Sequence, residues 1–372
     1  MKIRLRAERL LGLDEHQHVP LEGLAAEMNI SPYQLKHILN GSSKQISRHT
    51  LEAVCQYLLD HDRVKREALF QQLFEIVPES FWPLLAARQR INFSMGVRKG
   101  REAGAEQFVV AADAVLQNVM VNRLMGAQEC DKAVERDAKR QVIDSQLVLT
   151  WRTPGVSDAL VQEQATAFYN RWVRGQKNSA TVCIGSIKSN PTCDNVIAHA
   201  WANACAFQPE DNVRHEDDRS CPFVMIYRDE DPHPVSCWGG LRLVKNDPRA
   251  EPGIYYAGKS GMWEYAPCTD LEDAALVHYH FRKSRQNLEM VWGGFTGRST
   301  RLLAEMLSKG QAAKFWPPAI DNRHVSVGVF IVRFSFRQRP NEDTAHVALR
   351  DLRTKPQVIA LTEKVMAPRL AK

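Results

Sequence analysis

From about residue 88 onward, the chain alternates between short apolar runs and amphipathic stretches. The apolar runs are typical of buried strands and cover residues 91–97, 108–111, 142–151, 181–185, 222–227, 288–292 and 325–336. The stretches with helical spacing cover residues 115–124, 158–173, 196–207 and 300–307. Strands that alternate with helices are typical of layered α/β domains. We therefore expect an α/β domain with a mostly parallel sheet in this part of the chain.

The remaining segments have different patterns. Residues 235–267 place glycine and proline between short aromatic runs, which predicts an antiparallel insertion. The first sixty residues carry only short helical patterns, and residues 68–81 fit one more amphipathic helix. The sequence thus predicts four parts: an all-α domain over 1–64, a helical linker over 65–87, the α/β domain over 88–340, and a basic C-terminal extension over 341–372.

The composition excludes several classes of protein. Apolar residues make up 44% and charged residues 25% of the 372 residues, unlike a disordered or fibrous chain. No apolar run approaches the roughly 18 residues of a membrane span, and charges interrupt the N-terminus before a signal peptide could form. The eight cysteines form no CxxC pair. We expect reduced thiols, no metal site and a cytoplasmic protein without a membrane partner.

Residues 21–40 show the most specific local pattern. Ala25 supplies the small side chain that two steeply crossing helices need at their contact, and Asn29 tolerates the left-handed backbone of a tight turn. Ser31 is a good N-cap residue, and Pro32 stands at the first helical position. The pattern predicts two short helices joined by a tight turn.

This stretch and the residues after it resemble the helix-turn-helix of the Cro/CI-type repressor family, over roughly residues 8–60. The resemblance implies that the second helix enters the major groove of double-stranded DNA. Gln34 suits adenine, and Lys36 suits guanine or phosphate. The residues expected to contact DNA are Ser31, Tyr33, Gln34, Lys36, His37, Asn40, Ser43, Lys44 and Arg48. A helical bundle that contacts another protein is the alternative.

The charge balance of this segment bears on how it would bind DNA. The whole chain has a net charge of +6, but residues 1–64 hold eight Lys and Arg against eight Asp and Glu. A neutral module gains little from the release of counterions. We therefore expect binding as a homodimer, or with help from the basic C-terminal extension.

Two glycine-containing loops predict a ligand site. Each follows an expected strand, at 181–185 and 288–292, and precedes an expected helix, where backbone N–H groups and the helix dipole attract anions. Loops of this kind collect at one edge of a sheet, so we expect Lys188 and Arg298 to converge on one small anionic or nucleotide-like ligand. The expected ligand-binding residues are Gly185, Ser186, Lys188, Ser189, Asn190, Gly293, Gly294, Thr296, Gly297, Arg298, Ser299 and Thr300.

Two further pairs of residues each allow two interpretations. Gly96 and Asp113 could flank the same sheet edge, but the pattern favours Asp113 as a cap of the helix expected near Val115. His278 and His280 alternate with Tyr279 and Phe281, which favours a half-buried strand with both histidines on its polar face over a metal site.

These features together predict a DNA-binding transcriptional regulator whose α/β domain senses a small ligand and dimerises. We assign no cofactor beyond that nucleotide-like ligand. The alternatives are a nucleotide- or NAD-processing enzyme with an autoregulatory helix-turn-helix, and a protein-interaction scaffold. The chain contains no GxSxG, HExxH or zinc-deaminase pattern, so no catalytic residue is assigned from the sequence.

Overall fold

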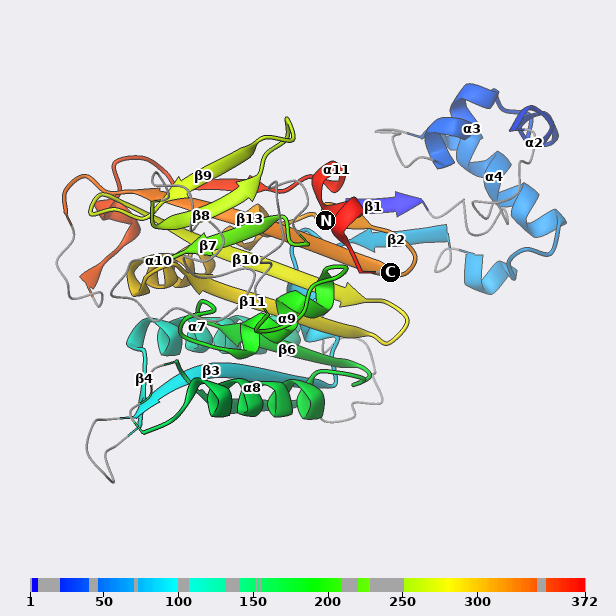
Figure 1. Ribbon diagram of the computed structural model, residues 1–372. Coiled ribbons are helices and arrows are strands. Elements are labelled where there is room, and N and C mark those ends of the chain that lie inside the picture. The colour runs from blue at the N-terminus through cyan, green and yellow to red at the C-terminus, as the bar shows by residue number, and fades with distance from the viewer. Residues whose placement is uncertain are drawn as a thin grey trace. The chain divides into compact units, whose positions relative to one another are not determined.

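The computed structural model describes residues 2–5, 21–39, 46–69, 73–99, 107–130, 141–151, 153, 155–208, 220–227, 251–339 and 346–371. The chain divides into two compact units, Met1–Glu79 and Ser80–Lys372 (Figure 1).

The first unit combines helices with a small sheet. Its elements are β1 (Lys2–Leu5), α2 (Leu21–Glu27), α3 (Pro32–Leu39), α4 (Arg48–Asp60), a 3₁₀ turn (Arg66–Ala68) and β2 (Phe74–Val77). β1 and β2 pair antiparallel. The expected all-α fold is therefore wrong: the described part is a mixed unit with short helices rather than a clear helix-turn-helix domain. The error arises because the period-two alternation of charged and apolar residues in β1 is too short to stand out in the sequence.

The turn between α2 and α3 has the expected local geometry. Asn29 has a φ of 52°, in the left-handed region. The backbone N–H of Gln34 donates to Ser31 Oγ at 3.2 Å, and the N–H of Ser31 donates to Gln34 Oε1 at 3.0 Å. This reciprocal pair is a capping box at the start of α3. Ala25, Leu35 and other apolar residues of these helices are buried in one cluster.

The second unit is built on a nine-stranded sheet with the order β12-β13-β10-β11-β6-β3-β4, in which β14 also pairs with β13 and β5 with β3. The bounds are β3 (Arg90–Lys99), β4 (Gln107–Val109), β5 (Val142–Leu149), β6 (Ser179–Ile184), β10 (Glu272–Arg282), β11 (Asn287–Gly294), β12 (Ile320–Asp321), β13 (Val325–Ser335) and β14 (Gln357–Ala360). A separate sheet contains β7 (Phe223–Ile226), β8 (Gly253–Ala257) and β9 (Trp263–Pro267).

The expectation of a mostly parallel sheet is also wrong. Three of the described pairings in the large sheet are parallel, β3–β5, β3–β6 and β6–β11, and five are antiparallel. The reason is the short connection between β10 and β11: Arg282 lies opposite Asn287, so the chain reverses within a few residues. A connection of that length can join only antiparallel strands. The sheet is mixed, within a mixed α/β fold.

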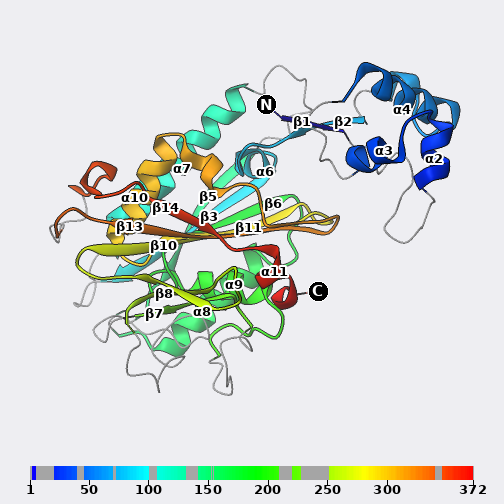
Figure 2. The ribbon, with the colours of Figure 1, turned by 90° about the horizontal axis from the view of Figure 1, so that it is seen from above.

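Helices cover both faces of the large sheet (Figure 2). One face packs against α6 (Trp82–Ala86), α7 (Ala111–Cys130) and α10 (Gly297–Ser308). The other packs against α8 (Asp158–Trp172), α9 (Thr192–Ala200) and the three-stranded sheet. The described part of the unit also contains the shorter helical segments Gln311–Phe315, Leu349–Asp351, α11 (Glu363–Met366) and Ala367–Arg369. The second unit thus has a sheet enclosed between two layers.

Two further segments differ from the sequence expectations. The region expected to form an amphipathic helix over 68–81 contains strand β2 instead. The expected C-terminal extension is part of the second unit, because β14 pairs with β13, Met366 is fully buried, and Leu370 bridges to Trp201. The described part of this segment is therefore integrated into the fold rather than an appended basic tail.

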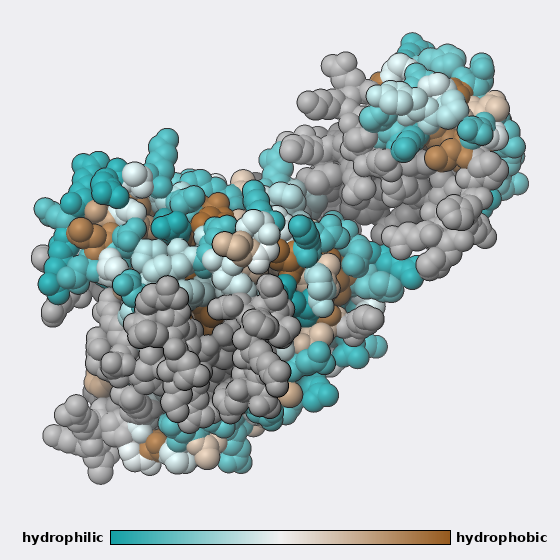
Figure 3. Space-filling model, turned by 45° about the horizontal axis from the view of Figure 1, so that its top comes forward, coloured by the Kyte–Doolittle hydropathy of each residue, from teal (hydrophilic) through white to brown (hydrophobic). Residues whose placement is uncertain are grey.

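No helix in the described ranges is long and apolar enough to cross a membrane. Hydrophilic residues cover most of the described surface that is visible in Figure 3.

Candidate functional site

The two glycine-containing loops lie side by side, as expected. They follow β6 and β11, which are parallel neighbours paired up to Ile184 and Trp292. A Cβ atom added to Gly293 would lie 2.3 Å from the backbone carbon of Gly185. Gly185 itself has a φ of +103°, a backbone conformation that L side chains rarely adopt. Glycine therefore allows the two loops to touch at the carboxyl edge of the sheet.

The polar groups of the first loop are mostly used within the protein. The fully buried Asn190 side chain donates to the carbonyl oxygens of Ser94 at 2.9 Å and Ile184 at 3.1 Å. The backbone N–H groups of Ser189 and Asn190 both donate to the Ser186 carbonyl. The loop is a closed, hydrogen-bonded turn that fixes α9 to the sheet.

The second loop also stabilises its own helix. Thr296 is the N-cap of α10 and forms a capping box with Ser299, and the Gly294 N–H donates to Thr300 Oγ1 at 2.9 Å. Ser299 and Thr300 are buried. These hydroxyl groups satisfy the first turn of α10 and are not directed to solvent.

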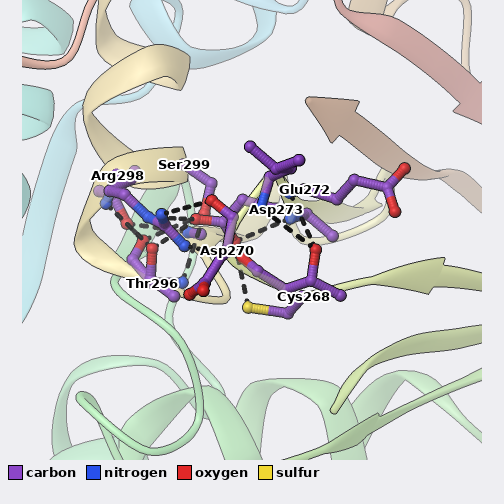
Figure 4. Close-up of polar contacts among 12 residues, drawn as sticks. Cys268, Asp270, Glu272, Asp273, Thr296, Arg298 and Ser299 are labelled. Carbon is purple, nitrogen blue, oxygen red and sulfur yellow. Dashed lines mark hydrogen bonds and ion pairs between the residues drawn. The ribbon is translucent and has the colours of Figure 1, made fainter. Parts of the chain in front are cut away.

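Arg298 is held in a largely buried ion pair, which overturns its assignment to the ligand site. Its Nε lies 3.6 Å from Asp273 Oδ2, and the two side chains are 12% and 0% exposed (Figure 4). Its Nη groups donate to the carbonyl oxygens of Asp270 at 3.3 Å and Thr269 at 3.1 Å. The Thr296 hydroxyl donates to the same Asp273 oxygen. Arg298 therefore clamps the start of α10 to the turn before β10.

Lys188 also contacts protein groups. Its Nζ lies 5.3 Å from the centre of the Tyr227 ring and 5.2 Å from that of Phe295, within cation–π range. The expected convergence of Lys188 and Arg298 on an anion is therefore wrong: one cation packs on aromatic rings and the other pairs with a buried carboxylate.

Asp113 and Gly96 both border the first loop. Asp113, in the first turn of α7, is 2% exposed, and its Oδ2 has no hydrogen-bond partner among the described residues. Burial raises the pKa of Asp113 to about 7, against the opposing effect of Arg98. A Cβ on Gly96 would lie 1.6 Å from the Ser189 carbonyl oxygen. Asp113 is thus a buried titratable group at this edge.

A second polar site is invisible in the linear sequence. The register aligns Asn92 of β3 with Thr181 of β6, Thr181 with Glu289 of β11, and Glu289 with His280 of β10. These four side chains form a row across one face of the sheet, and all are at most 2% exposed. We call them the polar row. On the opposite face, apolar residues of the same strands, such as Val182, pack in the hydrophobic core.

The polar row is joined by Arg282 at the end of β10 and by one residue each from α9 and α8. Arg282 forms an ion pair with Glu289, and its Nη2 donates to the His199 carbonyl oxygen at 3.0 Å. The His199 ring at the end of α9 lies with Nδ1 3.5 Å from Glu289 Oε2. Tyr169 of α8 packs edge-on against that ring, with ring centres 5.5 Å apart. Burial, followed by the charge of Glu289, raises the pKa of Tyr169, so this phenol stays protonated.

His278 and His280 are buried rather than half-buried, which corrects the expectation. They are 0% and 2% exposed, and none of their ring nitrogens has a hydrogen-bond partner among the described residues. Burial, with Arg282 next in size, lowers the pKa of His278 to about 3 and that of His280 well below its ordinary value. No group of three or more His, Cys, Asp or Glu in the described ranges could hold a metal ion.

The residues expected to contact DNA lie partly on α3. Tyr33 is 72% exposed and Lys36 is exposed. The His37 ring packs edge-on against the Tyr33 ring, with ring centres 4.3 Å apart. Gln34 and Ser31 take part in the capping box, and Arg48 pairs with Glu52 at 2.7 Å. Asn40, Ser43 and Lys44 lie outside the described residues.

Comparison of the chain with family models, with curated proteins and with solved structures finds no match. The features that bear on function are therefore those of the structure itself: a mixed sheet between two layers, two glycine-containing loops that meet at one edge of the sheet, and a buried polar row on one face.

Proposed function

We propose that the chain is a DNA-binding transcriptional regulator. The exposed face of α3 supports this proposal, because Tyr33 and Lys36 are exposed while Leu35 and Ile38 are buried. A helix that presents an aromatic and a basic side chain is suited to contact phosphates and base edges. Gln34 is left out of the proposed contacts with bases, because its side chain closes the capping box.

The regulator is proposed to act as a homodimer in the cytoplasm. The near-neutral charge of residues 1–64 favours two modules per site over one. Six cysteines, Cys55, Cys183, Cys193, Cys205, Cys221 and Cys268, form no disulfide, which suits a reducing compartment.

The second unit is proposed to respond to a small ligand at the edge where the two loops meet. Asp113 supports this, since a buried carboxyl oxygen without a partner among the described residues calls for a hydrogen-bond donor. Because Lys188 and Arg298 contact other protein groups, this edge favours a ligand that donates hydrogen bonds over an anion.

Selection of duplexes from a random DNA pool by the full chain tests the DNA part of the proposal. We expect a defined sequence to be enriched. Lys36→Ala should weaken binding to it by about 1–3 kcal/mol if Lys36 reaches a base edge. Lys65→Ala, which removes an exposed lysine outside α3, is the matched control and should bind as the wild type does. A pool that stays random after selection would contradict the proposal.

Mass spectrometry of small molecules released from the purified chain tests the sensor part. We expect a compound bound to the wild-type chain and reduced in Asp113→Ala. Asp158→Ala, at the exposed start of α8, should retain it. Identical contents in all three proteins would remove Asp113 from the ligand site.

A further inference from the structure

A cavity of about 420 Å³ lies between α7, α10 and the segment over residues 346–350. Its volume is within the range of pockets that bind small molecules. The two helices lie side by side (Figure 2), and their inner faces pack in one core cluster through Leu116, Met120 and Leu303. The cavity therefore has walls that the core of the second unit holds in place.

One part of the cavity lining is apolar. Val115 and Val119 are one helical turn apart on α7, and Ala304 of α10 also lines the cavity. Val347 adds a buried apolar side chain from the third wall. These side chains would gain free energy from contact with an apolar group, because that contact removes apolar surface from water.

Two arginines from different elements line the same cavity. Arg301 comes from α10 and is half-buried, and Arg350 comes from the 3₁₀ turn Leu349–Asp351 and is exposed. Among the described residues, neither guanidinium has a hydrogen-bond or ion-pair partner. Their like charges repel each other, and an oxyanion between them would relieve that repulsion and accept their hydrogen bonds.

Glu305 is the acidic group among the described lining residues, and both of its oxygens have partners. Oε1 lies 2.6 Å from Lys309 Nζ, and Oε2 accepts the backbone N–H of Leu349 at 2.5 Å. The lysine balances the charge of this carboxylate, so Glu305 leaves the two arginines available. Its bond to Leu349 also fixes the third wall of the cavity to α10.

We propose that this cavity binds a small organic anion with an apolar body. Arg301 and Arg350 bind its carboxylate or phosphate group, and Val115 and Val119 contact its hydrocarbon part. The site goes beyond the proposed function and does not depend on it, because its described lining includes neither Asp113 nor a residue of the two glycine-containing loops.

Isothermal titration calorimetry of the full chain with octanoate, octyl phosphate and the neutral octanamide tests the proposal. We expect both anions to bind, and the one with the lower Kd identifies the preferred head group. Octanamide should bind at least tenfold more weakly than octanoate, because it lacks the charge that the arginines bind. Inorganic phosphate should bind more weakly than octyl phosphate, because it has no apolar body.

Two arginine variants locate the site. Arg301→Gln and Arg350→Gln should each raise the Kd for the better anion at least fivefold. Arg353→Gln is the matched control, since it removes an exposed arginine that does not line the cavity, and its Kd should stay within twofold of the wild type. Because Arg350 is exposed, its substitution tests the site without a change in the core.

Three results would overturn the proposal. The first is the absence of binding by both anions, and the second is equal affinity for octanoate and octanamide. The third is an unchanged Kd in both Arg301→Gln and Arg350→Gln, which would place the bound anion elsewhere on the chain. Equal affinity for inorganic and octyl phosphate would contradict the apolar part of the site.

Discussion

Arg298 illustrates how a cation in a glycine-containing loop can serve the fold instead of a ligand. Its guanidinium pairs with the buried Asp273 carboxylate and bonds to two carbonyl oxygens of the preceding turn. Removal of one partner of a buried pair leaves the other charge without compensation, and this is far more costly than the loss of a surface pair.

Arg298→Ala is therefore expected to lower the free energy of unfolding by about 3 kcal/mol. The measurement is urea denaturation followed by circular dichroism. Arg323→Ala removes an exposed arginine and should leave the midpoint within error of the wild type. If Arg298→Ala unfolded at the same urea concentration as the wild type, the ion pair with Asp273 would not contribute to stability.

His278 makes stability depend on pH. Its pKa is about 3 in the folded chain and about 6.5 when unfolded. Between these values the unfolded chain binds more protons, so the contribution is fully present above pH 6.5 and is lost as the pH falls toward 3. The expected slope is about 1.4 kcal/mol per pH unit. This slope is measured by urea denaturation of wild type and His278→Leu between pH 7 and 4.5. If the free energy of unfolding had the same pH dependence in both proteins, His278 would not be the cause.

At the scale of elements, close backbone contacts fix the edge where the loops meet. Gly96 lies in β3 against the first loop, where a Cβ would meet the Ser189 carbonyl oxygen at 1.6 Å. Gly126 lies in α7 with no atom within 4 Å of an added Cβ. A side chain at Gly96 would clash with the first loop, whereas a side chain at Gly126 would meet no other atom. Substitution of Gly126 is therefore the control for substitution of Gly96.

Gly96→Ala should destabilise the chain by about 1–3 kcal/mol, because the loop must move away from the new methyl group. Gly126→Ala should stabilise it by up to about 1 kcal/mol, since alanine favours a helix and restricts the unfolded chain. Thermal unfolding of both variants measures the difference. Equal melting temperatures of the two variants would contradict the close approach of the first loop to Gly96.

Local patterns predicted more of the elements than of their arrangement. The strands at β3 and β6 and the turn at Asn29 depend on residues close in sequence, so periodicity and backbone sterics predicted them. The antiparallel half of the sheet depends on pairings between distant segments, such as β10 with β13, which no local pattern encodes. Asn92, Thr181 and Glu289 are far apart in the chain, and only the register of three strands aligns them. The alternation around His278 was visible, but it could not indicate that a second layer buries both of its faces.

At the scale of the whole molecule, two separate units suit a regulator in which one part binds DNA and the other responds to a ligand. Residues 1–64 have balanced charge, so one module would gain little from the phosphate backbone. Two modules on half-sites about 34 Å apart would combine their contacts. We therefore expect sequence-specific binding of DNA by a pair of chains.

Sedimentation equilibrium of the full chain with its selected duplex, at two salt concentrations, tests that claim most directly. We expect two chains per duplex, an affinity that decreases with salt, and at least tenfold weaker binding to a scrambled duplex of equal length. A tight complex of one chain per duplex would contradict the dimer, and equal affinity for both duplexes would contradict regulation through specific DNA binding.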